Sequence, residues 1–186
     1  MPQAIRKYCH VTDRSASLNG VALPVADAAG EKGAFLTALY RSLKIDYPKF
    51  FKMDSLSKLG FLAAELMLTD EKPRFTPRED VAIICFNRSA SLATDALYQA
   101  TIQGNGGYYP SPSLFVYTLP NIVAGEIAIR NKFFGETSFY VCEEWSAQQA
   151  LRAAHLALCD EHTRMVLTAW VECSEEACEA FMMLVE

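Results

Sequence analysis

The sequence predicts an α/β fold in which helices cover a mixed β-sheet. Along residues 34–186, apolar runs of strand length alternate with segments of helical period, and two strand-like runs follow each other at the end. The chain has 186 residues and is 51% hydrophobic. That size suits a single compact core, so we expect one domain over residues 1–186.

The first third of the chain is expected to hold a loop followed by two helices. Residues 1–33 are rich in Ala, Gly, Ser and Asp and show no sustained period, so they predict a loop-rich N-terminal segment. Residues 34–43 carry apolar side chains at helical spacing, and the Tyr47–Pro48 step ends that helix. Asp54 is placed to cap a second helix, whose apolar stripe runs from Leu56 to Leu66.

The middle of the chain predicts a buried strand and two more helices. Residues 81–86 form an uninterrupted apolar run, which is typical of a central strand buried on both faces. Residues 89–103 are helical in pattern and end at the glycine-rich residues 104–107, and residues 108–113 are expected to form an irregular connector. Residues 119–135 contain a helix whose small face, at Ala124, Gly125 and Ala128, is expected to allow close packing.

The last third predicts a strand, a helix and two strands. The strand covers residues 137–142, and the helix covers residues 147–158, with Ser146 as its N-cap and Gln149 three residues later. The final strands are expected within residues 164–172 and 180–186.

Composition excludes several classes of function. The net charge is −5, and the 17 Lys and Arg residues are scattered, which speaks against nucleic acid and anionic membranes as partners. No apolar run approaches the roughly 18 residues that span a bilayer, and no signal peptide is recognisable, so we expect a cytoplasmic protein. The six cysteines form no CxxC pair, and His10 and His162 lack a ligand spacing, so neither a metal nor a cofactor is expected.

Three segments, in order, resemble the N-terminal half of a β-ketoacyl synthase of the thiolase superfamily. The first is FKMDSLSKLGFLAAELML, which is similar to the family's helix after a Met-Asp pair. The second is PSPSLFVYTLPNIVAGEIAIRNKFFG, in which Asn121, Ala124–Gly125, Ile129 and Gly135 match the family's spacing. The third comprises the final strands, RMVLTAWVE and CEAFMMLVE.

The resemblance implies half of a thiolase-like fold with a five-stranded sheet. The family's catalytic histidines and lysine belong to its second half, so we expect a truncated protein without positions for them. In the family, a cysteine nucleophile lies at the helix N-terminus after the strand. An ungapped count from Asn121 and Gly135 puts that position at Glu144, followed by the bulky Trp145. The chain is in this respect similar to chain length factors, which carry glutamine there.

Two residues remain candidates for chemistry. Cys142 would be the nucleophile only with a two-residue gap, and period-two counting places it on the strand with Ser138 and Tyr140, as a packed thiol. Glu144 could act as an acid or assist decarboxylation, although an acidic residue in the first turn of a helix is stabilising in its own right. His155, three turns along the helix, is expected in the core or at an interface.

Three hypotheses follow from the resemblance. The first is a non-catalytic partner subunit in fatty acid, polyketide or aryl-polyene-type biosynthesis, which forms a homodimer or a heterodimer with a complete ketosynthase through the strand at residues 137–142. The second is an acyl-carrier-protein-dependent decarboxylase or acyltransferase that uses Glu144 or Cys142. The third is an acyl-chain binding protein, which would need an open apolar groove beside Glu144.

Overall fold

The computed structural model describes residues 4–25, 33–103, 109–174 and 177–186. Its centre is one mixed sheet in the order β3-β2-β1-β7-β6-β4-β5. The predicted α/β class is therefore confirmed, but the sheet has seven strands rather than the expected five. The strands are β1 (Ile5–Thr12), β2 (Ala16–Leu18), β3 (Val21–Ala22), β4 (Val81–Asn87), β5 (Thr137–Val141), β6 (Met165–Cys173) and β7 (Cys178–Val185).

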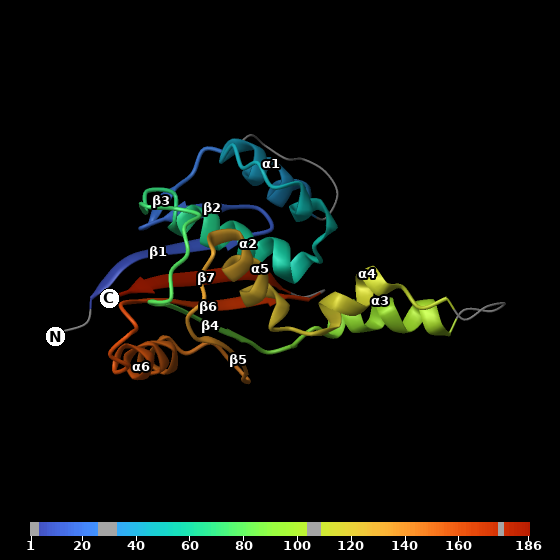
Figure 1. Ribbon diagram of the computed structural model, residues 1–186. Helices are drawn as coiled ribbons and strands as arrows, with labels where there is room; N and C mark the ends of the chain where they lie inside the picture. Colours follow the sequence, from blue (N-terminus) through green and yellow to red (C-terminus); the bar gives the residue numbers. More distant parts are fainter. Residues whose placement is uncertain (1–3, 26–32, 104–108, 175–176) are drawn as a thin grey trace.

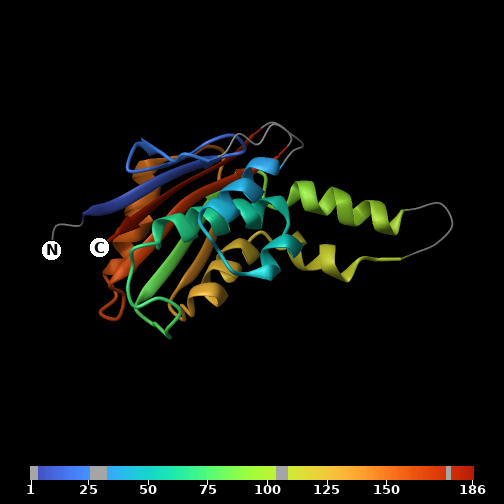
Figure 2. The same ribbon diagram turned by 90° about the horizontal axis from the view of Figure 1, so that it is seen from above.

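Helices lie on both faces of this sheet (Figure 1). The helices α1, α2 and α5 cover one face, and α6 packs on the other. Figure 2 shows that α3 and α4 project past one end of the sheet as an arm. The helices are α1 (Ala34–Ser42), α2 (Ser55–Met67), α3 (Leu92–Ile102), α4 (Pro112–Phe115), α5 (Ile122–Asn131) and α6 (Ala147–Leu158), with 3-10 turns η1 (Pro48–Lys52) and η2 (Val116–Thr118).

Three of the seven strands come from residues 1–33, which are therefore not the predicted loop-rich segment. Within their described part, β1 pairs antiparallel with β7, with Cys9 opposite Met182, and β2 and β3 follow as short antiparallel strands. Only Cys9 and Val11 of β1 are buried, while its other side chains are at least partly exposed. The hydrophobic alternation is therefore too short to be recognised in the sequence.

The segment before α5 also departs from prediction. The glycines at 104–107 lie outside the described residues, but the expected irregular connector contains α4 and η2. Pro112 occupies the first turn of α4, and the Ser111 hydroxyl accepts a hydrogen bond from the Leu114 amide at 3.4 Å. These are ordinary helix-start signals, and they act here in a helix of only four residues.

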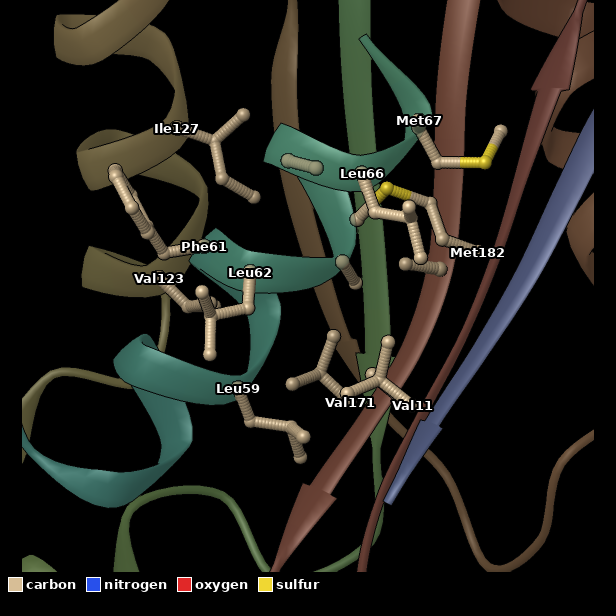
Figure 3. Close-up of a cluster of buried hydrophobic side chains, with 14 of the residues drawn as sticks. Val11, Leu59, Phe61, Leu62, Leu66, Met67, Val123, Ile127, Val171 and Met182 are labelled. Atoms are coloured by element: carbon tan, nitrogen blue, oxygen red, sulfur yellow. The ribbon is translucent and has the colours of Figure 1, made fainter. Parts of the chain in front are cut away.

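The main hydrophobic core lies between α2, α5 and the sheet (Figure 3). From α2, Leu59 and Leu66 point toward the strands, which contribute Val171 of β6 and Met182 of β7, while Leu62 extends toward Val123 of α5. Every residue of β4 and β6 is buried, as expected for central strands. Burial of these side chains supplies the main driving force for folding.

The helix α2 begins at the predicted cap and packs very closely against α5. The Asp54 carboxylate accepts a hydrogen bond from the Ser57 amide at 2.8 Å and another from the Thr94 hydroxyl at 2.9 Å. A Cβ atom at Gly60 would overlap a methyl of Val123, so the close approach depends on Gly60. Of the small face expected on α5, Ala124 is buried in the core, but Gly125 takes no part in the close packing, because no described atom lies within 4 Å of where its Cβ would be.

The opposite face carries a smaller core beneath α6. The residues of α6 that face the sheet are small, with Ala150, Ala154 and Ala157 buried, so the helix lies close to β4 and β6. The strands contribute Phe86 and Trp170 to this core.

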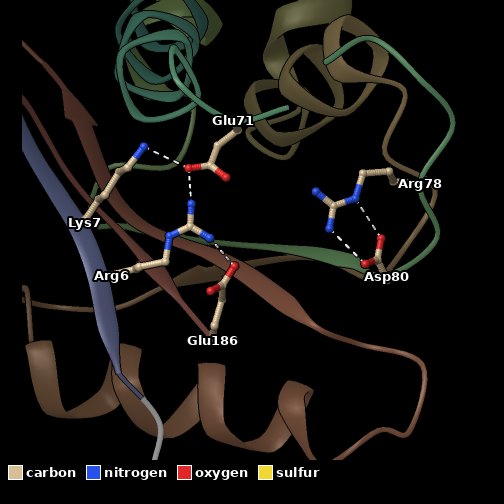
Figure 4. Close-up of polar contacts among 6 residues, drawn as sticks. All are labelled: Arg6, Lys7, Glu71, Arg78, Asp80 and Glu186. Carbon is tan, nitrogen blue, oxygen red and sulfur yellow. Dashed lines mark hydrogen bonds and ion pairs between the residues drawn. The ribbon is translucent and has the colours of Figure 1, made fainter. Parts of the chain in front are cut away.

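A group of ion pairs joins β1 to β7 and to the segment after α2 (Figure 4). Glu71 accepts hydrogen bonds from Lys7 at 2.8 Å and from Arg6, and Arg6 also pairs with Glu186. Partial burial tends to raise the pKa of Glu71, but the hydrogen bonds and charges of Lys7 and Arg6 outweigh it and hold that pKa below its usual value.

Among the described residues, no single helix is long and apolar enough to cross a membrane. The helical segments Pro112–Thr118 and Ile122–Asn131, which are bent relative to each other, reach that length and composition only when taken together.

Candidate functional site

The candidate site is the junction between β5 and α6, residues 141–146. It lies at the edge of the sheet where the parallel strands β4, β5 and β6 all end, which is where α/β folds commonly bind ligands. The Cys142 amide donates a hydrogen bond to the Asn87 carbonyl at 2.8 Å, so the junction is fixed to the end of β4. The sequence thus predicted the position of the junction correctly.

Cys142 lies just beyond the last residue of β5 and is half-buried. It packs against the small core beneath α6. Burial raises the pKa of its thiol above the usual value. The structure records no hydrogen bond to Sγ from any described residue. Nothing therefore favours the thiolate that a nucleophile requires.

Glu144 is exposed and lies outside the helix. The helix α6 has Ser146 as its N-cap, whose hydroxyl accepts a hydrogen bond from the Gln149 amide at 3.3 Å, and its first turn contains no acidic residue. Glu144 is thus two residues before the cap, and the expected placement of this acid in the first helical turn is wrong. Its carboxylate makes no ion pair or hydrogen bond within the described residues, so no described side chain is placed to orient it for proton transfer.

Trp145 occupies the space beside Glu144 on the sheet face. Its ring centroid lies 5.7 Å from that of Phe181, 6.2 Å from Trp170 and 6.4 Å from Phe86. Such distances are typical of packed aromatic pairs. The ring therefore fills the region where the acyl-binding hypothesis needs an open groove.

A buried carboxylate, Glu172, lies at the same edge of the sheet, at the end of β6. It accepts hydrogen bonds from the amides of Arg88 at 2.9 Å and Ser89 at 3.1 Å, and from the Ser89 hydroxyl. Three donors satisfy this carboxylate, so it holds the turn after β4 rather than acting as a free base. In the sequence it was identified only as the end of a strand, because nothing in the local pattern indicates its partners.

The histidine on α6 is not part of the junction. His155 is exposed, so the core alternative for it is wrong, and its Nε2 lies 4.0 Å from the Sγ of Cys159 one turn later. Among the described residues, no group of three or more His, Cys, Asp and Glu side chains could hold a metal ion.

An apolar surface begins at the same end of the sheet. It consists of the exposed side chains of the arm, which we define as α3, α4, η2 and Leu119, together with the free edge of β5. Strand β5 is the last strand of the sheet, and Tyr140 and Val141 are 48% and 59% exposed. On the arm, the exposed apolar residues are Leu92, Leu97, Phe115, Val116 and Leu119. Such a surface marks an interaction site in soluble proteins.

Solved structures share this architecture, although no family profile and no curated protein matches the sequence. A chain of the complex between a ketosynthase and its chain length factor from Xenorhabdus doucetiae aligns with a TM-score of 0.67 at 17% identity, over 100% of this chain and 79% of that one. The ishigamide ketosynthase/chain length factor gives 0.68 at 15%, over 99% of this chain and 62% of the other.

A third structure, a type II polyketide synthase acyl-carrier protein in complex with its ketosynthase, gives a TM-score of 0.63 at 13% identity. That alignment covers 99% of this chain and 62% of the matched chain. The chain thus spans less than two thirds of two of these three proteins. Its fold is that of the ketosynthases and chain length factors, as the sequence resemblance predicted.

Proposed function

Starting from this ketosynthase-like fold, we propose that the chain is a non-catalytic partner subunit of polyketide-type biosynthesis. In this role it binds a complete ketosynthase through the arm and the edge of β5. The observation that carries the proposal is the combination of this apolar surface with a junction where Glu144 is exposed and pairs with none of the described residues. Two of the similar structures contain a ketosynthase together with a chain length factor, which supports the same role.

The proposed pathway, cellular location and further partners rest on the resemblance of the sequence to β-ketoacyl synthases. The pathway could supply a fatty acid, a polyketide or an aryl polyene, and the expected setting is the cytoplasm. The acyl carrier protein is proposed as a second partner, because one similar structure holds a ketosynthase with such a protein. A homodimer is the alternative to a heterodimer, since both would cover the unpaired edge of β5.

The test is co-purification from the native host with identification by mass spectrometry. A tagged chain is expected to retain a complete ketosynthase, and Leu97→Asp on the arm and Val141→Asp on β5 are expected to release it. Val21→Asp is the matched control, because Val21 is 71% exposed on β3 at the opposite edge of the sheet. Retention of the ketosynthase by both arm and β5 variants would contradict the proposed surface.

Light scattering of the purified chain separates the two kinds of dimer. A chain that is monomeric alone and forms a one-to-one complex with the ketosynthase supports the heterodimer. A stable dimer that the same two variants dissociate supports the homodimer instead.

The catalytic alternative, an acyltransferase or decarboxylase, is tested separately. The chain is incubated with malonyl- and acyl-carrier proteins and analysed for a covalent adduct or released CO₂. We expect neither, because burial raises the pKa of Cys142 and no described group pairs with Glu144. An adduct on Cys142 would overturn the non-catalytic role.

A further inference from the structure

A cavity of about 310 Å³ lies at the ends of α1, α2 and α5, and the junction plays no part in it. Its charged and aromatic lining comes from segments far apart in the sequence. Lys44 follows α1, Glu65 comes from the last turn of α2, and Arg130 comes from α5. Thr69, Arg74 and Phe75 come from the segment between α2 and β4.

The lining carries more positive than negative charge. Lys44, Arg74 and Arg130 face a single carboxylate, Glu65, which leaves an excess of two positive charges. Glu65 is only 4% exposed and is already paired, with Arg74 at 2.6 Å and Arg130 at 3.4 Å. Lys44 forms no ion pair with any described residue. The nearby Asp46 is exposed, and Arg130 contacts its backbone carbonyl at 3.2 Å.

The two arginines do not use all their donors on protein groups. The Nη2 of Arg74 donates to Glu65 and, at 2.7 Å, to Asn131, but its Nε–H is buried without a partner. Arg130 donates through Nε and Nη1, and no hydrogen bond from its Nη2 to a described residue is recorded. The Nε–H of Arg74 is shielded inside the protein, so the Nη2 group of Arg130 is the guanidinium donor that an additional acceptor in the cavity would use.

The backbone of Phe75 is held in a strained conformation at this cavity. Its φ angle is 61°, in the left-handed region that bulky residues rarely adopt. In this position its ring lies 4.5 Å from the Cζ of Arg74 and 4.4 Å from that of Arg130. Tyr47 contacts Arg130 as well, at 4.9 Å. Rings in these positions hold both guanidinium groups in place, and such strain is often found at binding sites.

We propose that this cavity is a binding site for an oxyanion of the phosphate class. Guanidinium groups present N–H donors in a planar fork that matches phosphate oxygens, and Lys44 adds a point charge. A phosphate dianion would neutralise the excess of two charges, whereas a simple carboxylate would neutralise only half of it. This site is separate from the proposed subunit role, and either can fail without the other.

The test is calorimetric titration of the full chain with inorganic phosphate, at an ionic strength held constant with chloride. One site per chain is expected. Lys44→Gln is expected to weaken binding about three- to tenfold, the effect of one charged contact. The matched control is Lys52→Gln, which removes an exposed lysine that does not line the cavity and makes no ion pair with a described residue. Circular dichroism is used to check that both variants are folded.

Two further measurements make the test specific. Arg130→Lys keeps the charge but loses the fork, and it is expected to weaken phosphate binding at least as much as Lys44→Gln does. If glycerol 3-phosphate binds as tightly as inorganic phosphate, the site is assigned to phosphate esters. If glycerol 3-phosphate binds much more weakly, the site is assigned to free phosphate. No binding above the chloride background, or equal binding by Lys44→Gln and Lys52→Gln, would overturn the proposal.

Discussion

Gly60 of α2 lies so close to Val123 of α5 that any side chain at position 60 would overlap the Cγ2 methyl of the valine. A second, more distant contact lies on β6, where the same Cβ would come within 3.4 Å of Val171. The two helices and the strand therefore meet around a residue without a side chain. Position 60 thus fixes how closely α5 approaches the core.

Gly60→Ala is expected to lower the free energy of unfolding by about 1–3 kcal/mol, because the added methyl forces α2 and α5 apart. Denaturation in urea measures this difference. Gly125→Ala on α5 is the matched control, since nothing lies within 4 Å of its new methyl. That variant should gain up to about 1 kcal/mol from helix propensity. Equal effects of the two substitutions would contradict the packing argument.

Asp54→Ala is expected to cost about 1–2 kcal/mol in the free energy of unfolding. The substitution removes the cap of α2 and leaves the hydroxyl of Thr94, on α3, without its acceptor. Asp46→Ala serves as the comparison, because Asp46 is exposed and no described residue bonds to its carboxylate. Thermal unfolding of both variants measures their stability. If Asp54→Ala loses no more stability than Asp46→Ala does, Asp54 does not stabilise α2 as a cap.

Glu71 is expected to make the stability depend on pH. Its folded-state pKa lies below the ordinary value, so its contribution is present above the ordinary pKa and is lost as the pH falls through the folded value. Glu71→Gln should be less stable than the parent by about 1–2 kcal/mol at pH 7, and this difference should shrink as the pH falls below the ordinary pKa of a glutamate. Urea unfolding over this span of pH measures it.

The exposed residue Glu143 supplies the control for this titration. Glu143→Gln is the matched control for the change of side chain, because Glu143 is exposed and no described residue pairs with its carboxylate. If the stability difference between Glu71→Gln and the parent stays constant with pH, the ion pairs of Glu71 with Arg6 and Lys7 are not the cause of that difference.

The cysteines are expected to react with iodoacetamide in the order of their exposure. Cys159 is exposed and should react first at pH 8, and Cys142 should follow several-fold more slowly because burial raises its pKa. Burial raises the pKa of Cys9 and Cys85 to about 12, so these thiols should stay unmodified in the folded protein. Peptide mapping gives the rates, and a Cys142 that reacts before Cys159 would revive the nucleophile hypothesis.

Sequence reasoning placed the central elements well because their signals are local. The helix α6 was predicted with its bounds of 147 and 158, since Ser146 caps it and alanines recur along one face. Strand β4 was found because its residues are all apolar except the last, Asn87. In β1 the same reasoning failed, because only Cys9 and Val11 are buried and their partners on β7 are about 170 residues away.

At the candidate site, too, some features could be predicted from the sequence and others could not. The position of the junction follows from the order of strand and helix, which the sequence shows. The aromatic neighbours of Trp145 could not be predicted, because Phe86, Trp170 and Phe181 come from three different strands. The cavity lined by Arg74 and Arg130 could not be predicted either, since Glu65 lies 65 residues from Arg130 and no local spacing joins them.

The pairing of β1 with β7 also determines the order in which the chain can fold during synthesis. Strand β1 is translated before the other strands of this sheet and its partner β7 after them, while the opposite neighbour β2 pairs with only three residues of β1. Residues of β1 such as Arg6 and Lys7 therefore remain unpaired with β7 while the rest of the sheet is translated. At roughly 5–20 residues per second, this wait lasts on the order of ten seconds or more. The polar character of the early strand, which hid it from sequence reasoning, keeps it from aggregating during that interval.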